Sequence, residues 1–85
     1  MPYIKKEKRP QFDEQIEKIV PEDAGDLNYV ITKIALRYLA AKGKRYVNLN
    51  EVIGVFESAK LEFYRRVVAP YEDEKIEENG DVLES

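Results

Sequence analysis

The side chains that could do acid–base chemistry in this sequence are carboxylates. The chain has no His and no Cys, so serine–histidine and cysteine–histidine catalysis and thiolate metal sites are excluded. Two sets of carboxylates are spaced as neighbours on a helix: Glu14 with Glu17, and Glu74 with Glu77 and Glu78. Such pairs can hold Mg²⁺ in all-α nucleotide pyrophosphohydrolases. Because surface helices carry them routinely, we expect no enzyme, catalytic residue, metal or cofactor. A Mg-dependent nucleotide hydrolase remains an alternative.

Basic side chains gather at places that could contact nucleic-acid phosphates. One group precedes Tyr46, an aromatic residue that could stack on a base, and another lies further along the chain. The formal net charge of −3 and the absence of a helix-turn-helix pattern argue against this function. A nucleic-acid-associated accessory protein that uses the basic N-terminal arm and Lys42–Arg45 is therefore an alternative that we do not favour. Besides the arm (Lys5, Lys6, Lys8 and Arg9), its possible contact residues are Lys42, Lys44, Arg45, Arg65 and Arg66.

Length and composition predict one small helical domain over residues 1–85. The sequence is 44% hydrophobic and 36% charged, which is typical of a soluble globular protein. No apolar run approaches the ~20 residues that a membrane helix needs, and the first residues lack a secretory signal. We therefore expect no membrane partner and a cytoplasmic location. The charge is uneven: residues 1–10 carry a net +3 and residues 71–85 a net −6. We expect a basic N-terminal arm at 1–9 and a loose, acidic end at 80–85.

Apolar spacing predicts two helices in the first half of the chain. From Pro10 to Val20 the apolar residues recur at helical spacing, and Pro10 suits the first position of a helix. A second helix is expected from Asp26, as N-cap, to Ala41, with Gly43 ending it. This second helix is apolar around most of its circumference, which is typical of a helix covered on all sides.

The second half of the chain predicts one long helix and one short one. Asn48 and Glu51 have the spacing of a capping box, and an apolar stripe from Leu49 then runs to Pro70. A short helix could follow Pro70 and end at Gly80. No segment alternates as a strand does. The fold class is therefore all-α: a three-helix up-down bundle with a short fourth helix after Pro70 and an acidic C-terminal tail.

More apolar side chains are expected on the two long helices than a three-helix core can cover. Large exposed apolar patches mark interfaces. We therefore expect a protein–protein interaction or structural and regulatory module: a homo-dimer or higher homo-oligomer, or the binder of an unidentified protein. Its interface residues are predicted to lie along two helical lines: Tyr29, Leu36, Ala40, Gly54, Leu61 and Val68. Gly54 would let another helix approach closely.

Several separate strings resemble a family of small bacterial and bacteriophage proteins that carry a domain of unknown function. The chain begins MPYIK, continues with GDLNYVIT at 25–32, and ends with APYED, KI and ENGDV between 69 and 82. The similarity covers nearly the whole chain. It departs where Leu83-Glu84-Ser85 follows Val82, since the family's motif closes with Tyr. The resemblance implies a bacterial, archaeal or viral protein of the cytoplasm, and it transfers no catalytic or binding residue.

Overall fold

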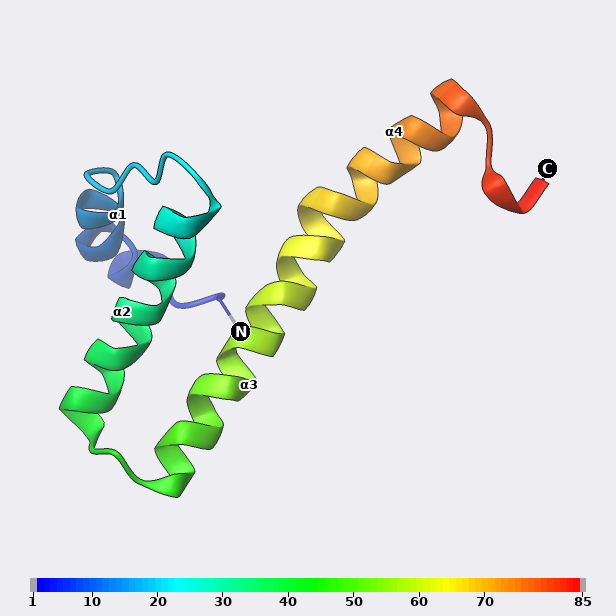
Figure 1. The fold of residues 1–85 in the computed structure, drawn as a ribbon. Helices are drawn as coiled ribbons and strands as arrows, with labels where there is room; N and C mark the ends of the chain where they lie inside the picture. Colours follow the sequence, from blue (N-terminus) through cyan, green and yellow to red (C-terminus); the bar gives the residue numbers. More distant parts are fainter. Residues whose placement is uncertain (1, 85) are drawn as a thin grey trace. The chain divides into compact units, whose positions relative to one another are not determined.

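The computed structural model describes residues 2–84, and helices joined by short loops make up most of them (Figure 1). No strand occurs within that range, which confirms the all-α prediction. The elements, in chain order, are η1 (Lys6–Lys8), α1 (Pro10–Ile16), α2 (Ala24–Lys42), α3 (Tyr46–Phe63), η2 (Tyr64–Val68), α4 (Ala69–Asn79) and η3 (Val82–Glu84). The residues group into a first unit, Pro2–Ile53, and a second unit that begins at Gly54. Each unit is described by itself below.

Helix α1 begins at Pro10 as predicted but is shorter than the apolar spacing suggests. Pro10 stands in the first turn, where its missing N–H costs nothing. The helix ends at Ile16, and the N–H groups of Lys18 and Ile19 bond to carbonyls only three residues back. The expected continuation to Val20 is wrong: the backbone leaves the α-helix after Ile16 through these three-residue hydrogen bonds, and Pro21 further disfavours helical backbone at Val20.

Helix α2 begins one turn earlier than the sequence suggests. The N-cap is Asp23, whose Oδ1 accepts a hydrogen bond from the Asp26 N–H at 2.8 Å. Asp26 in turn accepts from the Glu22 N–H at 3.1 Å, so the two carboxylates satisfy backbone donors reciprocally. At the other end Gly43 has φ +102°, a conformation that favours glycine, and it ends the helix as predicted.

Asn48 fixes the corner between α2 and α3, and the predicted capping box there is wrong. Helix α3 already begins at Tyr46, so Asn48 lies inside its first turn. The Asn48 Nδ2 donates to the carbonyls of Lys42, at 3.3 Å, and Gly43, at 2.8 Å. These carbonyls lie at the C-terminal end of α2, where a helix lacks its own donors. Asn48, 9% exposed, is the one buried residue that the structure describes.

In the second unit, α3 passes through a π turn into α4. The Ala69 N–H bonds to the Tyr64 carbonyl, five residues back, which places one extra residue in this turn. Helix α4 then carries Pro70 in its first turn. A proline inside a helix lacks an N–H and clashes with the preceding turn. The uninterrupted α-helix expected up to Pro70 is therefore wrong, while the expected fourth helix is present.

Both ends of the chain contain short ordered elements. In the arm, the Arg9 Nε donates to the Ile4 carbonyl at 3.0 Å beside η1. Beyond α4, Gly80 has φ +89°, and the Asp81 carboxylate accepts from the Leu83 N–H at 2.9 Å. These local hydrogen bonds hold a turn at each end, while nearly all the side chains there are exposed.

Candidate interaction surface

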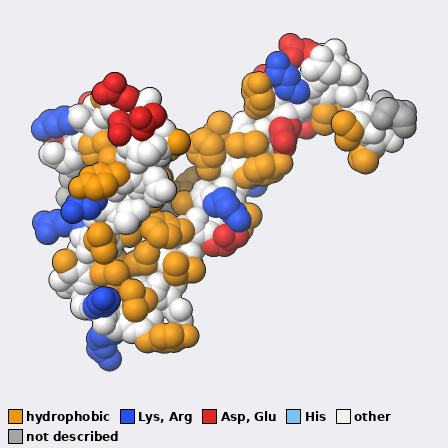
Figure 2. All heavy atoms as spheres, in the orientation of Figure 1, with side chains coloured by type: hydrophobic (Ala, Val, Ile, Leu, Met, Phe, Trp, Pro, Cys, Tyr) orange, Lys and Arg blue, Asp and Glu red, His pale blue; other side chains and the backbone are white. Residues whose placement is uncertain are grey.

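The main surface feature of this chain is apolar. None of the apolar side chains described by the structure is buried, and large ones are exposed on every helix. Figure 2 shows them over α2, α3 and α4 on the visible face. Contiguous apolar patches of this kind are uncommon on soluble monomers and mark sites of association.

Helix α2 carries exposed apolar side chains on two separate sides. Val30, Ala35 and Leu39 are half-buried. Exposed apolar side chains form two further lines: Leu27, Ile31 and Ile34 make one, and the predicted Tyr29, Leu36 and Ala40 make the other. At about 100° per residue, the two lines lie on nearly opposite sides of the helix. No single packed neighbour covers both.

The predicted α2 line is in place along one helix face. Tyr29 is 64% exposed and Leu36 53% exposed, and Ala40 is exposed as well. The Lys33 Nζ lies 5.7 Å from the centre of the Tyr29 ring, within the range of a cation–π contact. We name this set, Tyr29, Leu36 and Ala40, the α2 line.

The other three predicted interface residues lie in the second unit. Gly54 and Leu61 are exposed, and a Cβ built on Gly54 meets no atom within 4 Å. The chain itself therefore does not require glycine there. Val68 is half-buried and lies in the π turn. The extra residue in that turn rotates the following backbone by about 100°, so Val68 departs from the line of Gly54 and Leu61.

The same rotation aligns a stripe of larger apolar residues on α3 and α4. Phe56 and Phe63 share one face of α3, and the π turn brings Tyr71 of α4 onto that face, with Val67 between them. All four are exposed. We name this set, Phe56, Phe63, Val67 and Tyr71, the α4 stripe. Pro70 is the one residue of the sequence that could have indicated this stripe, because a proline inside a helix lacks an N–H and forces the preceding turn to change.

The basic residues proposed for nucleic acid do not form one continuous site. Lys42, Lys44 and Arg45 lie at the exposed corner between α2 and α3, beside the exposed Tyr46. Arg65 and Arg66 lie in the π turn of the other unit, and the Arg65 Nη2 is 2.8 Å from the Glu62 Oε1.

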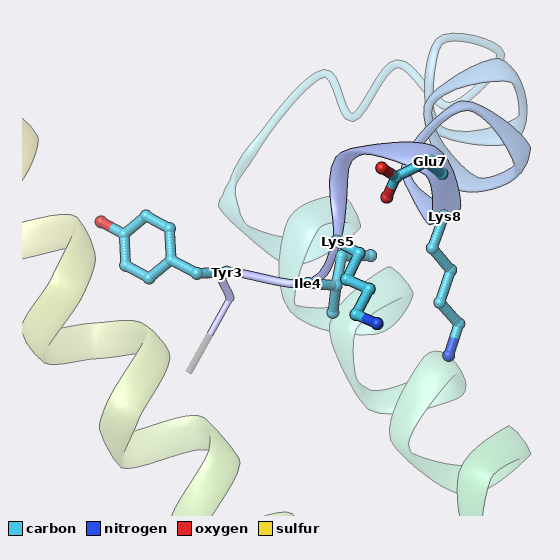
Figure 3. A pocket seen from close by; sticks show the side chains of 5 residues that line it. All are labelled: Tyr3, Ile4, Lys5, Glu7 and Lys8. Carbon is cyan, nitrogen blue, oxygen red and sulfur yellow. The ribbon is translucent and has the colours of Figure 1, made fainter.

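The N-terminal arm forms a shallow, open hollow lined by Tyr3, Ile4, Lys5, Glu7 and Lys8 (Figure 3). In that view Lys5 and Lys8 extend in the same direction, and Glu7 points away from them. No side chain that lines the hollow is buried, so it lacks the enclosing walls of a small-molecule site.

Several of the described carboxylates make local contacts with neighbouring side chains. Within residues 2–84 no group of three or more acidic side chains is placed to hold a metal ion. Glu78 pairs with Lys75 at 3.0 Å, and Glu72 accepts a hydrogen bond from the Tyr64 hydroxyl. The hydrogen bond to Glu72 and the negative charge of this carboxylate raise the pKa of Tyr64 above its usual value of 10.0. This contact joins the π turn to α4.

None of the described helices is both long and apolar enough to cross a membrane.

The fold and surface define a small all-α protein whose helices leave apolar faces uncovered. The chain belongs to the family Domain of unknown function (DUF6899), whose model matches residues 1–82. This match confirms the family resemblance found in the sequence. Comparisons with curated proteins and with solved structures gave no match.

Proposed function

We propose that this protein is a homo-oligomeric protein–protein interaction module, in its simplest form a dimer, whose apolar helix faces are covered by a second copy. The observation that carries the proposal is helix α2, which leaves large apolar side chains exposed on two nearly opposite sides. Apolar patches of this kind are uncommon on soluble monomers and mark sites of association.

Helix α2 supports a second copy as the partner. Large exposed apolar side chains lie on two nearly opposite sides of α2. A neighbouring helix covers a stripe about 100° wide. Helix α2 therefore needs at least two further neighbours, more than a chain of 85 residues readily supplies. In the dimer these added neighbours complete the up-and-down bundle expected from the sequence.

In this proposal the protein has a structural or regulatory role and does not act as an enzyme. It places the protein in the cytoplasm of a bacterium or archaeon, or in a virus-infected cell, as the family resemblance implies. Its function is to present an assembled helical surface, and an unidentified protein is the further partner that this surface could bind.

Light scattering coupled to size-exclusion chromatography tests the proposal directly. The expected species has at least twice the mass of the 9.9 kDa chain at micromolar concentration. Dilution should shift the population towards the single chain, because association depends on concentration. A monomeric mass at every concentration up to the solubility limit contradicts the proposal.

Nucleic-acid binding is the second candidate, and the corner between α2 and α3 favours it. No ion pair in residues 2–84 involves Lys44 or Arg45, and the aromatic Tyr46 beside them is exposed. Cations beside an exposed aromatic residue suit a single-stranded nucleic acid. Filter binding of DNA and RNA at low salt tests this candidate, with the double variant Lys44→Glu, Arg45→Glu as control. Equal retention of the control and the unaltered protein contradicts a role for the corner.

A further inference from the structure

The helical segment of the second unit contains two adjacent features at which helices bend. In the π turn, Tyr64–Val68, the Ala69 N–H bonds to the Tyr64 carbonyl, so the turn holds one extra residue. Pro70 follows at once, and it has no N–H with which to continue the backbone hydrogen bonds. Sharp kinks in helices occur mainly at prolines and at π turns. The backbone at Ala69 and Pro70 is therefore the place where this segment bends most easily.

A side-chain hydrogen bond crosses this place. The Tyr64 hydroxyl, in the first residue of the π turn, donates to the Glu72 Oε1 in α4. The neighbouring ion pairs do not cross it: Arg65 pairs with a residue of α3, and Lys75 pairs with a residue of α4. The contact between Tyr64 and Glu72 therefore connects the start of the π turn directly to α4.

This contact depends on the π turn. Residues eight positions apart, such as Tyr64 and Glu72, differ by about 80° around the axis of a regular α-helix. The extra residue changes that angle by about 100°, so the two side chains lie within about 20° of each other and share a face. Phe63 and Tyr71 are also eight positions apart, and the same turn brings them onto one face. The π turn, the hydrogen bond and the alignment of Tyr71 therefore occur together.

We propose that the π turn and Pro70 form a hinge within the second unit, and that the Tyr64–Glu72 hydrogen bond is the strap that holds this hinge closed. With the strap formed, Tyr71 continues the α4 stripe from Phe63. With the strap broken, α4 bends and rotates about Ala69 and Pro70, and Tyr71 leaves the stripe. The inference concerns contacts inside one chain and does not rest on the proposed self-association.

The strap is accessible to a competitor, which makes the hinge a conformational device. Tyr64 is 49% exposed, and Glu72 is exposed as well. A partner group that accepts the Tyr64 hydroxyl proton in a hydrogen bond, or one that donates to the Glu72 carboxylate, replaces one half of the strap. Binding of such a group opens the hinge and thereby changes the face that α4 presents beside α3.

Distances between two spin labels within one chain test the hinge. The chain has no Cys, so labels attach only at introduced thiols, Glu57→Cys in α3 and Glu77→Cys in α4. Both native residues are exposed, and they lie 20 residues apart, which is about 30 Å of helix. The labelled protein is diluted with an excess of unlabelled protein, so that the two labels of one chain dominate the signal. With the strap intact we expect one narrow distribution of distances.

Two variants break the strap from its two ends. In Tyr64→Phe and in Glu72→Ala we expect a broader distribution with added shorter distances, and a ratio of open to closed hinge that rises about threefold or more, because one hydrogen bond is lost. Glu72→Gln keeps an oxygen that accepts the hydrogen bond, so its distribution should stay narrow. The matched control Tyr71→Phe removes a hydroxyl outside the strap and should also stay narrow. Circular dichroism checks that each variant keeps its helix content.

The role of Pro70 is tested in the double variant Tyr64→Phe, Pro70→Ala. The new Ala restores an N–H and so a backbone hydrogen bond across the hinge, and the narrow distribution should return. A distribution that stays broad in the double variant overturns Pro70 as part of the hinge. Unless Tyr64→Phe and Glu72→Ala both broaden the distribution, the strap is overturned, because the hydrogen bond needs both of its partners.

Discussion

Truncation of Leu36 to Ala measures how far a partner covers the α2 line. Leu36 is 53% exposed. Complete burial of a Leu side chain stabilises by about 1.5–3 kcal/mol, so covering the exposed half contributes roughly 0.8–1.6 kcal/mol. A two-fold dimer contains this site twice, which doubles the effect to about 1.6–3.2 kcal/mol. The variant Leu36→Ala should therefore raise the dimer dissociation constant about 15- to 200-fold.

The measurement is sedimentation equilibrium over a range of concentrations. Ala favours a helix at least as well as Leu does, so α2 itself should remain formed in the single chain. The matched control is Leu83→Ala, since Leu83 is 89% exposed and lies outside both named surfaces. Its dissociation constant should equal that of the unaltered protein. A change of less than about threefold for Leu36→Ala would show that Leu36 stays in water in the dimer.

Three further predictions concern the rest of the molecule. The variant Gly54→Leu should reduce dimer mass in light scattering and leave helix content unchanged, because a Cβ at this position meets no atom within 4 Å. An unchanged mass would refute a close helix approach there. The variant Asn48→Ala should lower the free energy of unfolding by about 1–3 kcal/mol, because the carbonyls of Lys42 and Gly43 lose their donor. Urea titration measures this loss, and an unaltered urea midpoint would contradict the expectation. Tyr64 keeps its proton to higher pH when folded than when unfolded, so stability should fall as pH rises above 10.0. In the control variant Tyr64→Phe, stability should fall less steeply with pH. An equal fall in both proteins would show that the Tyr64 hydroxyl does not cause the pH dependence.

Local signals predicted much of the fold. Pro10, Gly43 and Gly80 mark helix ends whose chemistry is contained in one or two residues, and the structure uses all three as expected. Helical spacing of apolar residues also placed α2, α3 and α4. Such features are predictable because they depend on residues within one or two turns of the helix.

The sequence-based predictions of helix ends were wrong where two local patterns fit equally well, or where a side chain bonds to a residue outside its own helix. Asp23 and Asp26 are both good N-caps, and only the path of the preceding residues decides between them. Asn48 matched a capping box, yet its amide donates to the end of the preceding helix. That partner exists only once the corner has formed. The π turn before Pro70 likewise has no periodic signal of its own.

The predicted interface illustrates the same limit. The α2 line could be read from helical spacing, because α2 is regular throughout. The line of Gly54, Leu61 and Val68 assumed a regular helix, and the π turn breaks that assumption before Val68. The same turn aligns Tyr71 with Phe63, which a fixed period of 3.6 residues could not show. Whether these faces meet a partner depends on a second molecule and stays a prediction.

The hydrogen bonds of Asn48 explain how the start of α3 can be oriented on α2 although the apolar faces of these helices are exposed. The Asn48 side chain joins the start of α3 to the end of α2 by two hydrogen bonds. No apolar residue in the described chain is buried, so these polar contacts hold the corner without an apolar core. Hydrogen bonds are directional, so these contacts orient the two helices without consuming apolar surface. In the proposed assembly, the burial of apolar surface, which is non-directional, would be left for association. Folding and assembly would then share one source of free energy, and the stability of the protein would depend on its concentration.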